Sequence, residues 1–150
     1  MSNVTIRKAQ LHDCARILQL MKELAIFEGY IRKFRVGLPE LRHHLFEQKS
    51  IGVLVAIVDK RVEGILVYFF QPFTYDLSSW LVIKELYVAG QYRRLGLGCQ
   101  LLTAVQNVAQ KSHCSKIKWE VLTSNTAAKQ FYMRHGATLE SDWQIMSVEL

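Results

Sequence analysis

The chain has 150 residues, half of them hydrophobic, and a formal net charge of +6 at pH 7. That length suits a single domain, residues 1–150, whose core is large enough to need no disulfide or metal. The cysteines, Cys14, Cys99 and Cys114, are odd in number and lack C-x-x-C spacing, which disfavours a disulfide framework or a zinc site.

The composition also bears on location and partners. No basic region followed by an apolar core opens the chain, and charges at 59–63 interrupt its longest apolar region, 51–70. We therefore expect no signal peptide and no membrane span, and a cytoplasmic protein. Basic residues are scattered from Arg7 to Arg134, which favours a solvated surface that attracts an anionic cofactor over a nucleic-acid groove.

The first third of the chain predicts a strand and two helices. Residues 4–7 alternate like a short strand, and Asp13 stands at the position of a helix N-cap. Apolar residues then recur at helical spacing over 15–25, so this helix is expected to bury that face. A loop at 27–30 follows, and a proline near the start of 39–46 predicts a second short helix.

The rest of the chain predicts a sheet. Strands Gly52–Val58 and Val62–Phe70 form a hairpin, and the aromatic-rich loop 71–76 is expected at the rim of a site. The remaining elements are a strand Leu81–Val88, a helix with apolar periodicity over 101–109, a strand Ser115–Leu122, a helix from Thr126 to His135, and a closing strand Gln144–Val148 beside a core residue, Trp143. This order predicts a mixed, mostly antiparallel α/β (α+β) sheet flanked by helices.

One stretch of the sequence indicates a binding site. The apolar residues 81–88 lead into Arg93-Arg94-Leu95-Gly96-Leu97-Gly98, and an amphipathic helix follows. A strand, a glycine turn and a helix together aim backbone N–H groups and the positive helix end at a diphosphate. The string is not a Walker loop, and Leu101 stands where a dinucleotide fingerprint needs a third glycine or alanine.

A second motif is Asn125-Thr126-Ala127-Ala128-Lys129-Gln130-Phe131-Tyr132-Met133-Arg134-His135-Gly136-Ala137. Together with Arg93-x-x-Gly96-x-Gly98, in the right order and at a suitable distance, it resembles the GNAT superfamily of N-acetyltransferases, which bind acetyl-CoA. The segment from Ile6 to Glu28 is similar to the N-terminal segment of one branch, the diamine (spermidine/spermine) acetyltransferases.

The resemblance implies a twisted sheet in which the parallel strands 81–88 and 115–122 splay apart, with acetyl-CoA in the gap. The N–H of Val88 would polarise the acetyl carbonyl, and Tyr132 would sit beside the sulfur as general acid. It implies no metal, and a homodimer is common among similar enzymes. The residues that would contact the cofactor are Leu86, Tyr87, Val88, Arg93, Arg94, Leu95, Gly96, Leu97, Gly98, Cys99, Asn125 and Ala128.

The chemistry of amine acetylation supports an acid at Tyr132. Attack of an amine on a thioester makes an oxyanion, which needs a fixed donor, and expels a thiolate, which a nearby proton donor assists. A tyrosine of pKa about 10 protonates the thiolate of a thiol of pKa about 8.5 at a cost of roughly 2 kcal/mol. Tyr132 follows Asn125 by two helical turns, so both can face the cofactor. Alternatively, Phe131 and Tyr132 are an aromatic pair that anchors a helix.

The amine also needs a base, because it is protonated at neutral pH. Lys84 stands where the diamine enzymes usually carry a glutamate, and strand alternation predicts that the adjacent Glu85 points to the opposite face. Glu28 and Glu120 remain as acidic contacts or as proton relays through water, with plain surface carboxylates as the alternative. The predicted acceptor set is therefore Phe27, Glu28, Lys84 and Glu120.

We expect an acetyl-CoA-dependent N-acetyltransferase that acts by direct transfer to a small primary amine. A diamine-like acceptor comes first, and amino-acid or protein lysine amines come second. Cys99 has no evident histidine and acid partners for a covalent mechanism, and the adjacent His43 and His44 cannot share one helical face as a metal pair. Two other classes stay open: a catalytically silent domain that binds acetyl-CoA as a sensor, and a nucleic-acid module.

Overall fold

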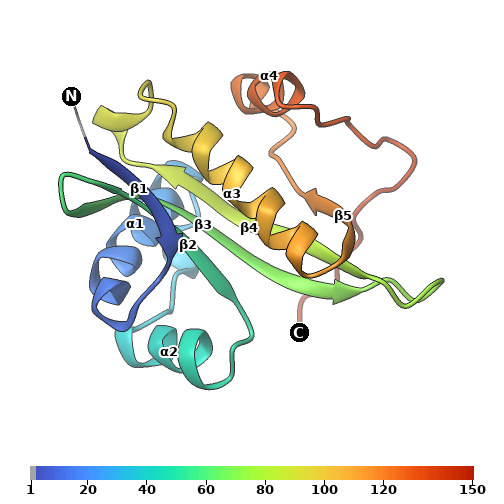
Figure 1. The fold of residues 1–150 in the computed structure, drawn as a ribbon. Coiled ribbons are helices and arrows are strands. Elements are labelled where there is room, and N and C mark those ends of the chain that lie inside the picture. The colour runs from blue at the N-terminus through green and yellow to red at the C-terminus, as the bar shows by residue number, and fades with distance from the viewer. Residues whose placement is uncertain (1–2) are drawn as a thin grey trace. The chain divides into compact units, whose positions relative to one another are not determined.

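The computed structural model describes residues 3–150 and divides them into two compact units (Figure 1). The first unit ends at Trp119, and the second is Glu120–Leu150. The first holds the sheet and most of the helices, and the second holds one further helix.

The sheet of the first unit has five strands in the order β1-β2-β3-β4-β5. The first four pair antiparallel, and β5 pairs parallel to β4. The mixed, mostly antiparallel sheet with one parallel pair is therefore confirmed. The strands are β1 (Val4–Lys8), β2 (Gly52–Val58), β3 (Arg61–Pro72), β4 (Ser79–Val88) and β5 (Cys114–Trp119).

Helices cover both faces of this sheet (Figure 1). The long helices are α1 (Cys14–Phe27) and α3 (Leu97–Lys111); α2 (Leu38–Arg42) is short and continues as a π-helical turn, η3 (His43–Glu47). Single turns of 3-10 helix are η1 (Leu11–Asp13), η2 (Ile31–Lys33) and η4 (Gly90–Tyr92). Apolar residues at helical spacing bury one side of each long helix, as predicted.

The two faces pack differently. On one face, buried residues of α1 and α2 meet side chains of β2 and β3, among them Val55, Ile65 and Val67. On the other face, α3 packs on the sheet above Gly64: a Cβ there would lie 3.4 Å from Cδ1 of Leu101, an ordinary van der Waals contact. This packing places α3, which begins directly after the glycine turn, against the sheet.

A β-bulge interrupts the pairing of β3 with β4. Val67 pairs with Glu85 and Tyr68 pairs with Ile83, which leaves Lys84 as the extra residue. Paired residues share a face, and the consecutive Val67 and Tyr68 point to opposite faces. Glu85 therefore lies on the α1 face with Val67, although simple alternation from Ile83 would place it on the other face.

The parallel pair is short. Pairing of β4 with β5 runs from Ser79–Cys114 to Ile83–Trp119, and β4 then continues for five residues, Lys84–Val88, paired with β3. The predicted strand to Leu122 was too long, since β5 ends at Trp119. Within residues 3–150, no strand continues the ladder on this edge of β4.

The structure adds detail to two expectations for the first unit. Asp13 occupies the N-cap of α1, as predicted, but its carboxylate does not cap that helix. The carboxylate instead accepts from the Gln10 N–H at 2.7 Å, in the capping box of η1, and pairs with Arg7. The aromatic loop lies at the first end of β4, away from the glycine turn, and there Phe73 stacks on Trp80 with centroids 4.5 Å apart. There it packs the end of the β3–β4 hairpin.

The second unit holds α4 (Thr126–Arg134), close to the predicted helix. The predicted closing strand Gln144–Val148 was wrong, because that segment forms neither helix nor strand. Trp143, expected in the core, is 82% exposed. An alternating pattern shows which face a strand would bury, but a strand forms only where a neighbouring edge supplies hydrogen bonds.

Candidate active site

The glycine turn is open and shaped for an anion. Residues Arg93–Gly96 are exposed, and Gly96, the N-cap of α3, has φ +76°. A Cβ at Gly96 would meet no atom within 4 Å, so its glycine is required by the backbone and leaves space above the turn. Because this N-cap has no side chain, the first amides of α3 have no side-chain cap. Such a helix start attracts negative charge.

The free edge of β4 presents backbone groups beside this turn. The N–H of Ala89 donates to the carbonyl of Glu63, in β3, at 2.8 Å. Successive amides of a strand point to opposite edges, so the N–H groups of Val88 and Leu86 point away from β3, toward the edge that β5 leaves open. Tyr87, grouped with them in the sequence prediction, directs its own backbone groups to β3 instead.

Arg93 connects the turn to the end of α1. Its guanidinium carbon lies 5.6 Å from the ring centroid of Phe27 and 5.5 Å from that of Tyr87. Its Nε donates to the carbonyl of Val88 at 3.1 Å. Cation–π contacts of this kind hold side chains together at a surface. The structure thus gathers Phe27, Tyr87 and Arg93, which the sequence assigned to separate acceptor and cofactor sets.

Glu85 is the residue that sequence reasoning set aside. Burial and, to a lesser degree, the nearby charge of Glu28 together raise the pKa of Glu85 to about 7, although the charge of Lys84 lowers it. Near neutral pH, both protonation states of Glu85 are therefore populated, as a proton acceptor requires. The bulge at Lys84 brings Glu85 to the α1 face, where Glu28 caps the end of that helix. Two adjacent charges in an apolar strand were the only sequence signal.

In the second unit, the predicted cofactor residues lie around the start of α4. The side-chain oxygen of Asn125 caps the helix by accepting from the N–H of Ala128 at 3.1 Å. Tyr132, near the end of α4, is half-buried, and its ring meets that of Phe131 edge-on with centroids 5.5 Å apart. The aromatic pair thus has a packing function whatever its chemistry. Glu120 is exposed and directly follows β5.

Neither a membrane-spanning helix nor a cluster of metal-ligand side chains occurs among the residues that the structure describes. Among the helices of residues 3–150, none has the length and apolar character needed to cross a membrane. In that same part of the chain, no three or more histidine, cysteine, aspartate or glutamate side chains are grouped so as to hold a metal ion.

Comparison with known proteins defines the class. The sequence model of the Acetyltransferase (GNAT) family matches residues 16–137, and the chain belongs to this family. It is thus an acetyltransferase. The thialysine N-epsilon-acetyltransferase of Mus musculus is 30% identical over 145 residues, which cover 91% of this chain and 85% of the relative. The Homo sapiens spermidine/spermine N(1)-acetyltransferase-like protein 1 is 29% identical over 150 residues, 93% of this chain and 22% of the relative.

Solved structures agree on the fold. An aminoglycoside acetyltransferase from an uncultured soil metagenomic sample has a TM-score of 0.83 at 21% identity, over 98% of this chain and 96% of that one. An integron cassette protein of V. cholerae has a TM-score of 0.80 at 23% identity, over 97% of this chain and 92% of that one. The relatives identified by sequence support the branch predicted from Ile6 to Glu28.

Proposed function

We propose that the protein transfers an acetyl group from acetyl-CoA directly to a primary amine of a small molecule. The observation that carries the proposal is the open edge of β4, with outward amides at Leu86 and Val88, beside the uncapped start of α3. A long polar cofactor with a diphosphate needs these two features side by side.

The residues present fit acetyl-CoA, which would supply the thioester carbonyl that the amine attacks. The amides after Gly96 would hold the diphosphate, and Arg94, exposed in the same turn, would add charge. Leu86 and Val88 would pair with the pantetheine arm, and the N–H of Val88 would stabilise the developing oxyanion. From the second motif, Asn125 would hold the arm and Tyr132 would protonate the leaving sulfur.

Glu85 would act as the base, directly or through water. Its pKa of about 7 lets it accept a proton from an ammonium group and release that proton again at neutral pH. Glu28, which shares this face, would attract the cationic acceptor. The paired carboxylates favour a diamine-like acceptor, whose second ammonium group keeps a positive charge near them.

An amino acid with a side-chain amine is the second candidate acceptor. The exposed Lys84 stands next to Glu85 in the bulge and could pair with the carboxylate of such an acceptor. Relatives of the chain are named for thialysine and, in Arabidopsis thaliana, for L-ornithine. A zwitterion would place its amine at Glu85 and its carboxylate at Lys84.

Release of free thiol from acetyl-CoA tests the proposal with a panel of diamines, polyamines, ornithine, thialysine and a lysine peptide. We expect amine-dependent release with at least one of the small amines. Binding of acetyl-CoA without release for any amine would instead identify a silent sensor domain. Retention on a phosphate-bearing polymer that persists at saturating CoA would favour a nucleic-acid module.

Tyr132→Phe is expected to lower turnover at least tenfold while acetyl-CoA affinity stays within about twofold, because only the proton donor is lost. The ring that meets Phe131 is retained in this variant, so packing is preserved. Steady-state kinetics and direct titration of CoA measure the two effects. Unchanged turnover would leave the aromatic-pair explanation for Tyr132.

Lys84→Gln is expected to shift the acidic limb of the pH profile of kcat/KM to higher pH. The positive charge of Lys84 lowers the pKa of Glu85, so removal of this charge raises that pKa. The ionised form of Glu85 that acts as the base then appears only at higher pH. Lys22→Gln, which changes an exposed lysine on α1, is the matched control. An unmoved limb in Lys84→Gln would mean that another group controls the profile.

A further inference from the structure

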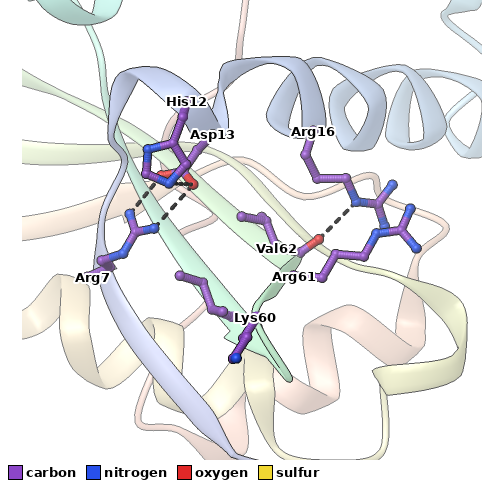
Figure 2. A pocket seen from close by; sticks show the side chains of 8 residues that line it. Arg7, His12, Asp13, Arg16, Lys60, Arg61 and Val62 are labelled. Carbon is purple, nitrogen blue, oxygen red and sulfur yellow. Dashed lines mark hydrogen bonds and ion pairs between the residues drawn. The ribbon is translucent and has the colours of Figure 1, made fainter.

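A basic cavity lies beside β1, at the edge of the sheet opposite to β5. It has a volume of about 220 Å³ and is lined by residues of β1, η1, α1, β2, β3 and the turn between β2 and β3 (Figure 2). None of its lining residues belongs to β4, α3 or the glycine turn. Its side chains therefore take no part in the proposed acetyl transfer.

Two buried carboxylates organise the cationic walls. On one wall, Asp13 accepts from both terminal nitrogens of Arg7, at 2.7 and 3.2 Å, and lies 3.4 Å from His12 (Figure 2). Burial by itself would raise the pKa of Asp13, but the bonds from Arg7 and from the Gln10 N–H hold that pKa below its usual value. Asp13 is therefore an anion that fixes the position of Arg7.

On the opposite wall, Glu63 is 2% exposed and pairs with Arg16 at 3.1 Å and Arg61 at 3.5 Å. Arg16 also donates from Nε to the carbonyl of Val62 at 2.9 Å (Figure 2). Two guanidinium groups thus share this buried carboxylate, and Arg16 also lies 3.6 Å from the carboxylate of Glu23. Both guanidinium groups line the cavity.

Lys60 adds a further charge at the turn between β2 and β3. Asp59 and Lys60 both have positive φ, 49° and 71°, which is the geometry of a tight two-residue hairpin turn. Within residues 3–150, Lys60 has no ion-pair partner. Four permanent cations, Arg7, Arg16, Lys60 and Arg61, therefore line the cavity, and three carboxylates, Asp13, Glu63 and Glu23, pair with them.

We propose that this cavity binds a phosphate-type dianion, either free phosphate or a small phosphate monoester. The lining cations outnumber the carboxylates that pair with them, so the cavity favours an anion, and guanidinium groups on opposite walls offer the forked donors that phosphate oxygens accept. The carboxylates behind these walls keep the arginines in place before the ligand arrives, which reduces the ordering cost of binding.

Calorimetric titration with inorganic phosphate at pH 8, at fixed ionic strength, tests the proposal on the full chain. Saturable binding is expected, and Lys60→Glu/Arg61→Glu should weaken it at least tenfold. The double variant Lys22→Glu/Lys111→Glu makes the same change in net charge at exposed lysines outside the cavity, and should stay within twofold. Lys60→Glu alone, which breaks no ion pair, should weaken binding at least threefold even if the double variant folds poorly.

A second arm uses glycerol 3-phosphate. Tighter binding than inorganic phosphate supports the monoester as the ligand, and equal or weaker binding supports the free ion. Gly96→Val, which alters the glycine turn, should leave phosphate affinity unchanged. The proposal is overturned if wild-type protein shows no saturable binding, if both turn variants bind as wild type does, or if Gly96→Val abolishes binding and so assigns phosphate to the glycine turn.

Discussion

Glu85→Gln is expected to lower kcat/KM at pH 7 by about a hundredfold, the size of effect typical of a lost general base. Glutamine keeps the shape of the side chain on the α1 face but cannot accept a proton from the amine. The measurement is the initial rate of thiol release with the best amine of the panel, at several amine concentrations. Glu85→Asp should retain part of the activity, because it keeps the carboxylate.

The pH profile of the wild-type enzyme gives an independent test of the same assignment. Only the ionised form of Glu85 can accept a proton, and its pKa is about 7. The value of kcat/KM should therefore rise with pH through 7, and this acidic limb should vanish in Glu85→Gln. If Glu85→Gln retains the limb and Glu28→Gln or Glu120→Gln loses it, the base is one of those two residues.

The ionised carboxylate of Glu85 should also lower the stability of the folded protein. This effect distinguishes a catalytic role of Glu85 from a structural one. Its pKa is raised from 4.5 to about 7 in the folded protein, so the folded state binds more protons than the unfolded state in this window. Stability from this group is therefore present at low pH and is lost as pH rises through 7. Above pH 7, Glu85→Gln should melt at a higher temperature than wild type, with about 2–4 °C for each kcal/mol gained. A lower melting temperature at pH 8 would indicate that the carboxylate serves packing.

Gly96→Val is expected to weaken acetyl-CoA binding by about a hundredfold. A β-branched residue at φ +76° strains the turn by on the order of 1–3 kcal/mol, and its side chain would stand in the open space where the diphosphate meets the amides. Direct titration with CoA measures the change. The same variant should leave the fold intact, because a Cβ at this position meets no atom within 4 Å.

Gly90→Ala is the matched control for the turn. Gly90 is exposed in η4, its φ is not positive, and a Cβ there also meets nothing within 4 Å. Its CoA affinity should stay within about twofold of wild type, since neither strain nor obstruction is introduced. Equal CoA affinity in Gly96→Val and wild type would show that the diphosphate binds elsewhere.

Local patterns predicted most of the first unit. Apolar residues at helical spacing located α1, and the run 52–58 matched β2 residue for residue. The glycine turn could also be read from the sequence, because a residue with positive φ before an uncapped helix favours glycine over other residues. These features depend on neighbours in the chain, which a sequence displays directly.

The places where prediction failed all depend on partners distant in the chain. The bulge at Lys84 arises from the register of β4 against β3, and the early end of β5 from its pairing with β4. Alternation of side chains along one strand does not reveal an extra, unpaired residue in the ladder. The sequence therefore predicted the wrong face of the sheet for Glu85. The alternating residues 144–148 likewise found no strand partner within the described chain.

The sequence by itself determined the family, the strand–turn–helix at Gly96 and the positions of the helices, because propensity, periodicity and glycine chemistry act over a few residues. Only the tertiary structure decided that Glu85 joins Glu28 and acquires a pKa of about 7, and that the amides of Leu86 and Val88 face an open edge. The physical reason is that burial, charge proximity and ladder register are properties of pairs of segments. They come into existence only when those segments meet.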